Sequence, residues 1–345
     1  MKKVVLLLLF LPTITFSQQT VNASIIYDNL QRDYILYVPA IYNANNPTPL
    51  VLNFHGKTGT ANGQMWHGDF RAIADSVNFI IVHPQGLLNS SGETHWNVGQ
   101  SGTVIDDIGF VSSLIDSIST SYNINSNRIY STGMSNGAYM SYRLACELSD
   151  RIAAIGPVAG STITYMINNC NPIHPTPIIH IHGEADSSCI YLGKPAVESI
   201  PSILDFWVNH NFCDTQAVLT QVPNINLFDS SVVEHYVWQN GFSGVDVEHY
   251  KIINGGHTWP GSLFPNNNGL TNYDINASTE IWRFFSKYDI NGLIISATSF
   301  TEIEIRNNKL LKIVNVLGKK TKIEKNIPLF YIFDDGSVKK KIIIE

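Results

Sequence analysis

The sequence predicts an α/β protein with a mostly parallel sheet and helices on both faces, followed by a small all-β module. Continuous apolar runs such as PLVLNFHG, FIIVHPQG and PIIHIHGEAD are typical of buried parallel strands. Segments with apolar residues at helical spacing alternate with these runs, and strands that alternate with helices form parallel sheets. The helical pattern stops after Asp289, where the chain becomes rich in Lys and Ile.

The first predicted element is a hairpin of two strands, ASIIYDN and DYILYVP, with Asn29 in its turn. Between the strands PLVLNFHG and FIIVHPQG, the segment MWHGDFRAIADSV carries apolar residues at helical spacing. The segment DDIGFVSSLIDSISTSY is a clearer helix with one apolar face, and Asp106 or Asp107 can cap its start.

A short strand, RIYSTG, leads directly into the predicted helix NGAYMSYRLACEL. IAAIGPVAG and PIIHIHGEAD are further buried strands, and VESIPSILDFWVNH is a helix. SVVEHYVW and VEHYKIING alternate polar with apolar residues, which indicates strands near the sheet edge. The amphipathic helix STEIWRFFSKY closes the region, and two β-like segments, LLKIVNVLGKKTKIEKN and LFYIFDDGSVKKKIIIE, make up the last module.

The first residues, MKKVVLLLLFLPTITFSQQ, have the organisation of a signal peptide. Two lysines precede a short apolar run, and Thr15 and Ser17 stand at positions −3 and −1 before a cut at Gln18. The run is too short to span about 30 Å of hydrocarbon, so we expect no stable membrane span. We therefore predict a signal peptide over residues 1–17, an α/β domain over 18–291 and a β module over 295–345.

Charged residues make up 14% of the 345 residues, the net charge is −6, and no basic block precedes the tail, which excludes nucleic-acid partners. The cysteines, which are Cys146, Cys170, Cys189 and Cys213, lack CxxC spacing and zinc-site histidines, so we expect no metal and no other cofactor. An exported chain can form disulfides. Three pairings of all four cysteines are possible, and one bridge with two buried thiols is an equal alternative.

Ser135 stands between two glycines in GMSNG, at the point where a predicted strand passes into a helix. This is the setting of a nucleophile elbow, although an ordinary Gly/Ser turn is the alternative. The hydroxyl needs a base and an acid, in the chain order Ser, Asp or Glu, His, each on a loop after a strand. Asp186 follows one buried strand and His257 lies in a Gly-rich loop after another, while Glu184 is the competing acid. A turn role for Asp186 and a structural role for His257 remain as alternatives.

Acyl transfer also needs donors for a tetrahedral oxyanion. NFHGKTG ends a strand and enters a Gly-containing loop, so the Lys57 N–H is the first candidate and the Asn136 N–H the second. The alternative for this loop is a simple strand-terminating turn. Trp96 and Trp259 lie in loops near the predicted mouth, where they either stack on an aromatic acyl group or sugar ring or pack in the rim.

Seven motifs recur together and in order: HG (55–56), PQG (84–86), WN (96–97), DDIGF (106–110), GMSNGAYMSYRLAC (133–146), HIHGEAD (180–186) and GGHTWPG (255–261). Over residues 25 to 290 the chain resembles the polyhydroxybutyrate depolymerase-type esterases, close to secreted feruloyl and acetylxylan esterases. The resemblance implies an α/β-hydrolase fold with Ser135, Asp186 and His257 as a catalytic triad. The segment ADSSCIY departs from the family, which usually has hydrophobic residues and a proline after the Asp.

The tail is similar to C-terminal sorting domains of the type IX secretion pathway, with a carbohydrate-binding β module as the alternative. We therefore expect an extracellular or cell-surface protein, exported through the periplasm, whose partners are the type IX machinery and an ester substrate derived from a polymer. The predicted function is that of a serine carboxylesterase acting on feruloyl or acetyl substituents of plant polysaccharides or on short hydroxyalkanoate esters. The rivals are a catalytically inactive polymer-binding protein on the same scaffold and a secreted peptidase.

Overall fold

The computed structural model describes residues 18–99, 104–294, 310–315, 318–322, 328–333 and 338–342. The predicted signal peptide, residues 1–17, lies outside the described residues. The chain divides into two compact units, residues 1–294 and residues 295–345.

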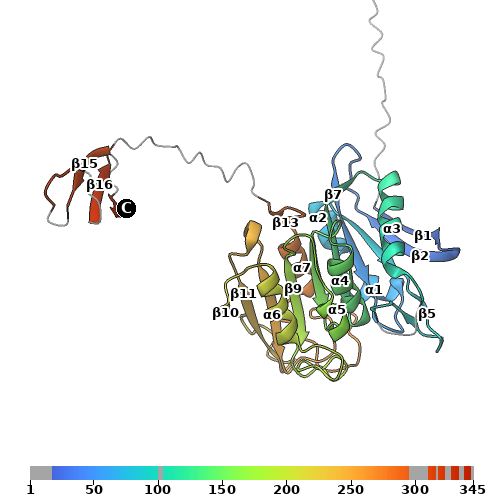
Figure 1. Cartoon of the computed structure of the whole chain (residues 1–345). Coiled ribbons are helices and arrows are strands. Elements are labelled where there is room, and N and C mark those ends of the chain that lie inside the picture. Colours follow the sequence, from blue (N-terminus) through green and yellow to red (C-terminus); the bar gives the residue numbers. More distant parts are fainter. Residues whose placement is uncertain are drawn as a thin grey trace, which may run out of the picture. The chain divides into compact units, whose positions relative to one another are not determined.

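The first unit is built on a ten-stranded sheet whose six central strands, from β4 to β12, run parallel (Figure 1). Antiparallel strands extend both edges, β1 and β2 on one side and β11 and β10 on the other. In spatial order the strands are β1 (Gln19–Tyr27), β2 (Leu30–Val38), β4 (Ile80–Pro84), β3 (Thr48–Phe54), β7 (Ile124–Met134), β8 (Ala154–Val158), β9 (Ile178–Gly183), β12 (Val247–Ile253), β11 (Val232–Trp238) and β10 (Val218–Gln221). The predicted mostly parallel sheet is confirmed.

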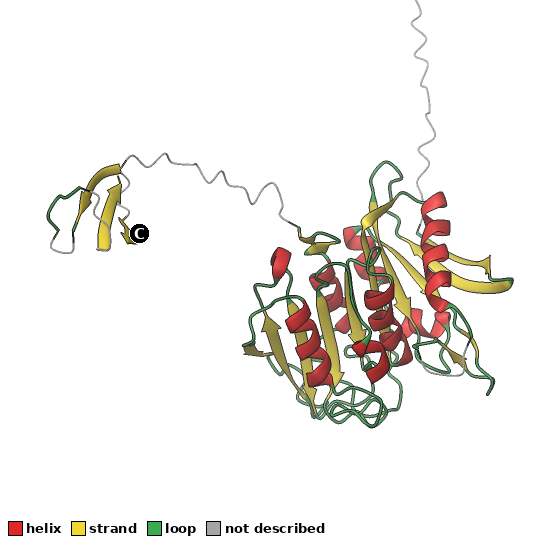
Figure 2. Cartoon of the chain, in the orientation of Figure 1, coloured by secondary structure: helices red, strands yellow, loops and turns green. Residues whose placement is uncertain are grey.

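Helices cover both faces of the sheet (Figure 2). Because side chains alternate along a strand, Leu50 and Leu52 of β3 join the core beneath α3, α4 and α6, whereas Val51 joins the core with α2 and α7. The helices are α1 (Ala61–His67), α2 (Arg71–Val77), α3 (Asp107–Ser121), α4 (Asn136–Glu147), α5 (Thr164–Asn168), α6 (Ile200–His210), α7 (Ala277–Phe285) and the short 3₁₀ helix η1 (Phe242–Gly244).

The segment MWHGDFRAIADSV departs from expectation, because it contains the end of one helix and the whole of another. Gly68 ends α1, and a Cβ atom at this position would lie only 3.0 Å from the ring of Trp259. The carboxylate of Asp69 then accepts a hydrogen bond from the Arg71 N–H at the start of α2. The spacing of apolar residues therefore did not reveal the break between α1 and α2, where Gly68 packs against Trp259.

Two further details concern the strands. The predicted hairpin forms between β1 and β2, and its turn residues Asp28 and Asn29 have φ angles of 50° and 60°. Such left-handed pairs suit a two-residue hairpin. SVVEHYVW and VEHYKIING form β11 and β12, which are the second and third strands from one edge and so lie near it as predicted, whereas β10, which the sequence did not indicate, forms the edge itself.

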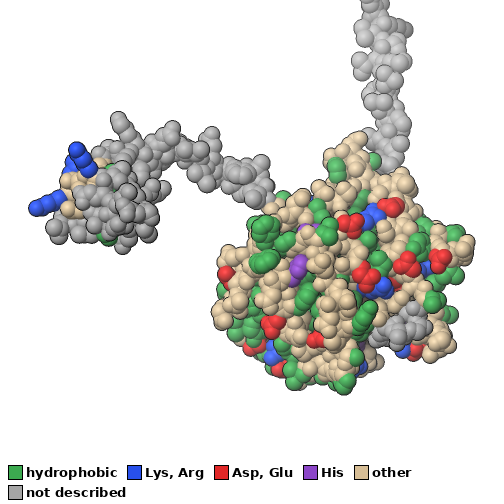
Figure 3. Space-filling view, in the orientation of Figure 1, with side chains coloured by type: hydrophobic (Ala, Val, Ile, Leu, Met, Phe, Trp, Pro, Cys, Tyr) green, Lys and Arg blue, Asp and Glu red, His purple; other side chains and the backbone are tan. Residues whose placement is uncertain are grey.

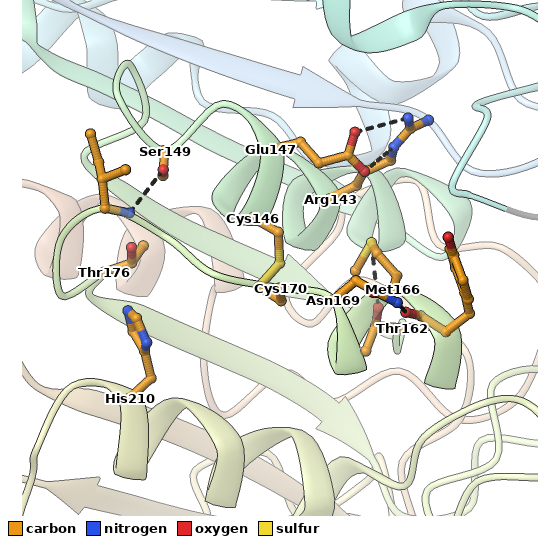
Figure 4. Close-up of a disulfide and its surroundings, with 12 residues drawn as sticks. Arg143, Cys146, Glu147, Ser149, Thr162, Met166, Asn169, Cys170, Thr176 and His210 are labelled. Atoms are coloured by element: carbon orange, nitrogen blue, oxygen red, sulfur yellow. Dashed lines mark hydrogen bonds and ion pairs between the residues drawn. A yellow bond between two sulfur atoms is a disulfide. The ribbon is translucent and has the colours of Figure 1, made fainter.

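One disulfide joins Cys146, near the end of α4, to Cys170, two residues after α5 (Figure 4). Cys189 and Cys213 are free thiols, the first partly exposed and the second buried. The alternative of one bridge and two thiols is thus the one that the structure contains, except that Cys189 is not fully buried.

The remaining strands are short. The pairs β5 (Leu87–Leu88) with β6 (Thr94–His95) and β13 (Tyr288–Asp289) with β14 (Gly292–Leu293) form two small antiparallel sheets. In the second unit, β15 (Leu310–Val314), β16 (Pro328–Phe333) and β17 (Val338–Ile342) form a three-stranded antiparallel sheet.

The face of the first unit drawn in Figure 3 carries scattered charged side chains among uncharged polar and apolar ones. Within the described ranges, every helix is too short or too polar to cross a lipid bilayer.

Candidate active site

Ser135 occupies a sharp turn between β7 and α4. It is the N-cap residue of α4, with φ 56° and ψ −121°, a conformation that is strained for any residue with a side chain. Its N–H donates to the Val158 carbonyl of β8, at 3.0 Å, which pins the turn to the sheet. A Cβ atom would lie 2.6 Å from the Phe54 carbonyl oxygen at Gly133 and 2.2 Å from it at Gly137. Both glycines of GMSNG are therefore required by the closeness of β3.

Asp186 and His257 are in direct contact. His257 Nδ1 lies 2.7 Å from Asp186 Oδ2, and both residues are buried. Asp186 Oδ1 accepts two further hydrogen bonds, from the Ser188 and Cys189 N–H groups, each at 2.8 Å. A carboxylate oxygen accepts, so Nδ1 is the nitrogen that donates in this contact, and Nε2 is the ring nitrogen left for another partner.

Ser135 and His257 line one cavity of about 750 Å³. Asp186 is not on its wall but lies behind His257, as an orienting acid would. Glu184, the competing acid, is exposed and forms an ion pair of 2.7 Å with Lys251. The structure therefore brings Asp186, and not Glu184, to the histidine.

The loop after β3 forms another wall of this cavity. Gly56 lies against Ser135, since a Cβ atom on it would be 3.3 Å from Ser135 Cβ. Burial lowers the pKa of His55 to about 4, so its ring is neutral. His55 Nδ1 donates to the Gly56 carbonyl at 2.7 Å, and Nε2 accepts from the Gly86 N–H at 2.9 Å. The ring thereby holds the loop that carries Lys57 in place.

The two predicted oxyanion donors have different settings. Lys57 lines the cavity, and its ammonium group pairs with Glu93 at 2.6 Å. Asn136 is the first residue of α4, so its N–H has no partner inside the helix. Its side-chain oxygen accepts a hydrogen bond from the Trp96 N–H at 2.7 Å, which ties the WN loop to the start of α4.

The tryptophans expected at the mouth are elsewhere, and this expectation is corrected. Trp96 and Trp259 are each only 1% exposed. Trp96 Nε1 donates to the His55 carbonyl at 3.0 Å, and Trp259 Nε1 donates to Ser278 Oγ at 3.2 Å. Their large rings fill space beneath the loops, so their indoles pack in the core and do not reach the mouth.

Three residues that the sequence reasoning missed do line the cavity. Trp66 of α1 and Phe264 are 43% and 58% exposed, and their ring centroids are 5.6 Å apart in an edge-to-face arrangement. His67 Nδ1 lies 2.9 Å from the Phe264 carbonyl oxygen, and burial lowers the pKa of this histidine. No motif marks these positions, because they meet only when α1 folds against the loop after GGHTWPG.

A second potential nucleophile stands beside Ser135. The Cys189 thiol is in hydrogen-bonding contact with the hydroxyls of Tyr139 and Ser135, and burial raises its pKa to about 11. A thiol needs to ionise to attack, so Cys189 stays protonated at neutral pH. In the described part of the chain, no group of three or more His, Cys, Asp or Glu side chains is arranged to hold a metal ion.

Comparison with known proteins finds relatives with esterase names. Residues 32–197 match the family model described as Esterase PHB depolymerase. A bifunctional acetylxylan esterase/xylanase from Neocallimastix patriciarum is 28% identical over 262 residues, which are 76% of this chain and 34% of that protein. Feruloyl esterase D from Neurospora crassa is 25% identical over 283 residues, covering 79% of this chain and 86% of that protein. These relatives support a carboxylic ester hydrolase.

The esterase fold is also found among solved structures. Acetyl xylan esterase from Aspergillus awamori superimposes with a TM-score of 0.54 at 16% identity, over 79% of this chain and 99% of that one. The likeness confirms the predicted α/β-hydrolase fold. The chain spans 34% of the length of the Neocallimastix patriciarum relative, whose name joins two activities.

Proposed function

We propose that the protein is a secreted serine carboxylesterase in which Ser135 is the nucleophile, His257 the general base and Asp186 the acid that orients the imidazole. One observation carries the proposal. His257, whose Nδ1 lies 2.7 Å from Asp186 Oδ2, lines the same cavity as Ser135. The strained turn at Ser135 and the esterase names of the relatives support it further.

In the acylation half-reaction, Ser135 Oγ attacks the ester carbonyl carbon while His257 Nε2 takes the hydroxyl proton. The carbonyl electron pair moves to oxygen, and the N–H groups of Lys57 and Asn136 stabilise this negative charge. When the carbonyl re-forms, the bond to the alkoxide oxygen breaks, and His257 gives its proton to this oxygen, which leaves as the alcohol. The product is an acyl-enzyme on Ser135.

Water completes the cycle by the same route. The oxygen of a water molecule attacks the acyl carbon while His257 Nε2 takes one of the water protons. The proton then passes to Ser135 Oγ as the carboxylic acid leaves. Asp186 stays ionised throughout and stabilises the imidazolium that forms in each half-reaction. No cofactor takes part in these steps.

We propose feruloyl or acetyl substituents of plant polysaccharides, or short hydroxyalkanoate esters, as substrates. The names of the relatives, acetylxylan esterase and feruloyl esterase, support the acetyl and feruloyl classes. The exposed rings of Trp66 and Phe264 beside the cavity offer an apolar surface to an acyl group or a sugar.

The experiment that tests the proposal is a comparison of these three ester classes with the purified protein. Methyl ferulate, acetylated xylan and a hydroxybutyrate oligomer present the same carbonyl chemistry on different acyl and alcohol groups. Release of acid from at least one class is the expected result. Absence of hydrolysis on all three, and on a chromogenic acetate ester, contradicts an esterase.

We also propose that residues 295–345 form an export address that takes no part in catalysis. All the proposed catalytic residues precede Pro260, and the first compact unit ends at Ile294. The disulfide between Cys146 and Cys170 supports export to an oxidising compartment.

A chain ending at Ile294, the last residue of the first compact unit, is therefore expected to fold and to keep the ester turnover of the full chain. Residues 295–345, fused behind a signal peptide and a reporter, should direct the reporter out of a host with the type IX pathway. Turnover of the shortened enzyme and the location of the reporter are the two measurements. Loss of folding after truncation, or a reporter retained in the periplasm, contradicts this role.

A further inference from the structure

Two histidines that the proposed mechanism does not use are buried directly behind the catalytic acid. His180 and His182 stand two residues apart on β9, so their rings lie on one face of the strand. Both are buried, and the rings stack with centroids 5.3 Å apart and an interplanar angle of 11°. Such an array of polar rings in a core requires partners for every nitrogen atom.

The ring nitrogens form one hydrogen-bonded chain. Tyr142 Oη lies 2.7 Å from His180 Nδ1, and His180 Nε2 lies 3.2 Å from His182 Nδ1. At the far end, His182 Nε2 lies 2.8 Å from the Cys189 carbonyl oxygen and 3.4 Å from Asp186 Oδ2. The chain therefore runs from α4 through β9 to the loop that carries the acid.

The last link determines the direction of all the others. A carbonyl oxygen only accepts, so His182 Nε2 must carry a hydrogen. Burial lowers the pKa of His182, although the Asp186 carboxylate acts in the opposite direction, and burial lowers the pKa of His180 well below its usual value. Each ring is then neutral with a single N–H. His182 Nδ1 accepts from His180 Nε2, and His180 Nδ1 accepts from the Tyr142 hydroxyl.

A third buried histidine holds the other end of the same loop. His249 Nδ1 donates to the His180 carbonyl at 3.0 Å, so its Nε2 accepts from the Tyr191 hydroxyl, also at 3.0 Å. Burial lowers the pKa of His249 to about 3, which keeps this ring neutral. The loop after β9 is thus attached to the sheet through Cys189 and through Tyr191.

We infer that His182 is the positioning residue for Asp186. It acts in two ways. Its Nε2–H donates to the Cys189 carbonyl, and the N–H of the same residue donates to Asp186 Oδ1 at 2.8 Å. His182 Nε2 also lies 3.4 Å from Asp186 Oδ2, the oxygen that accepts the hydrogen bond from His257. The Asp186 side chain is fully enclosed, so these N–H groups stand where water would otherwise stabilise its charge. The inference rests on the proposed esterase function.

His182→Met introduces an apolar side chain of similar length and removes the Nε2–H group. We expect kcat for a chromogenic acetate ester to fall about a hundredfold, the effect of a small misplacement at a reacting centre. KM should stay nearly unchanged, because substrate contacts remain. His182→Gln places an amide N–H near the position of Nε2 and should restore most of kcat.

His83 provides a matched control. It is also fully buried on a central strand, but its ring nitrogens have no hydrogen-bonded side-chain partner among the described residues, and the Asn53 backbone lies next to the ring. His83→Met should therefore leave kcat unchanged, whatever it does to the melting temperature. Wild-type kcat in His182→Met, or an equal loss in His182→Met and His182→Gln, overturns the inference.

A measurement on the unmodified protein keeps the inference testable if His182→Met does not fold. Nitrogen-15 spectra of histidine-labelled protein report which ring nitrogen bears hydrogen. We expect the Nε2–H form at both His180 and His182 at neutral pH, and the opposite or the charged form at His182 overturns the inference. Failure of the esterase proposal is recognised separately, by ester turnover that survives Ser135→Ala or is absent from the wild type.

Discussion

Replacing Ser135 by alanine is expected to lower kcat for ester hydrolysis by about six orders of magnitude, since the members of a catalytic triad act as a unit. His257→Ala should cause a loss of similar size. Asp186→Asn should lower kcat by about four orders of magnitude, because an amide in place of the carboxylate favours the wrong imidazole tautomer. Initial rates and titration with an active-site-directed organophosphate measure these losses.

Glu184 provides the control for the acid. It lies two residues from Asp186, is exposed and pairs with Lys251, so Glu184→Gln should change kcat little. Activity near that of wild type in Ser135→Ala would remove the serine from the proposed role. A larger loss of kcat in Glu184→Gln than in Asp186→Asn would mean that Glu184, and not Asp186, is the acid that orients His257.

The second large effect concerns stability. Arg32 and Asp107 form an ion pair of 2.5 Å with side chains that are 1% and 0% exposed. Arg32→Met leaves the Asp107 charge buried with one partner fewer, so we expect the free energy of unfolding to fall by about 3–5 kcal/mol. Replacing both residues by apolar ones should recover much of this loss, because no charge then remains without its partner.

A pair that is only partly buried serves as the comparison in the same denaturant titrations. Arg151 and Asp116 lie 2.6 Å apart with side chains 23% and 68% exposed. Arg151→Met should lower the free energy of unfolding by about 1 kcal/mol or less. Equal effects of the two substitutions would mean that burial does not govern the Arg32 pair.

The DDIGF and WN motifs acquire a physical meaning from these contacts. Asp107 Oδ2 accepts a hydrogen bond from the Asn97 N–H at 2.7 Å, and Arg143 of α4 donates to the Asn97 carbonyl. With the pairing of Asn136 and Trp96, the loop of WN is attached to α4 at two points. These motifs support the helix that begins next to Ser135, and their residues do not line the cavity.

The positions of the catalytic candidates were accessible to sequence reasoning because each has a local signal. Ser135 has flanking glycines that the nearby Phe54 carbonyl requires, and Asp186 and His257 each follow a buried strand. The substrate wall had no such signal. An aromatic residue in a predicted loop is expected to be exposed, yet Trp96 and Trp259 are buried. The burial of such a ring depends on which distant segments of the chain cover it.

Other failures have the same origin. The pairing of Cys146 with Cys170 depends on how α5 packs beside the end of α4, which spacing does not report. In the sequence His180 and His182 look like ordinary strand residues. Their hydrogen-bonded chain to Tyr142 is known only once β9 and α4 are placed in the fold. Local chemistry can be read along the chain, whereas contacts between distant segments need the fold.

The disulfide makes the stability of the first unit depend on whether Cys146 and Cys170 are oxidised. It closes a loop of 24 residues' separation, and cross-linking a loop of this length stabilises the folded state by about 3–4 kcal/mol. That is a large share of the roughly 5–15 kcal/mol that keeps a domain folded. A newly made, still reduced chain is therefore closer to its unfolded state than the oxidised protein. Formation of the bond shifts the balance towards the folded chain, so reducing conditions are expected to destabilise this domain.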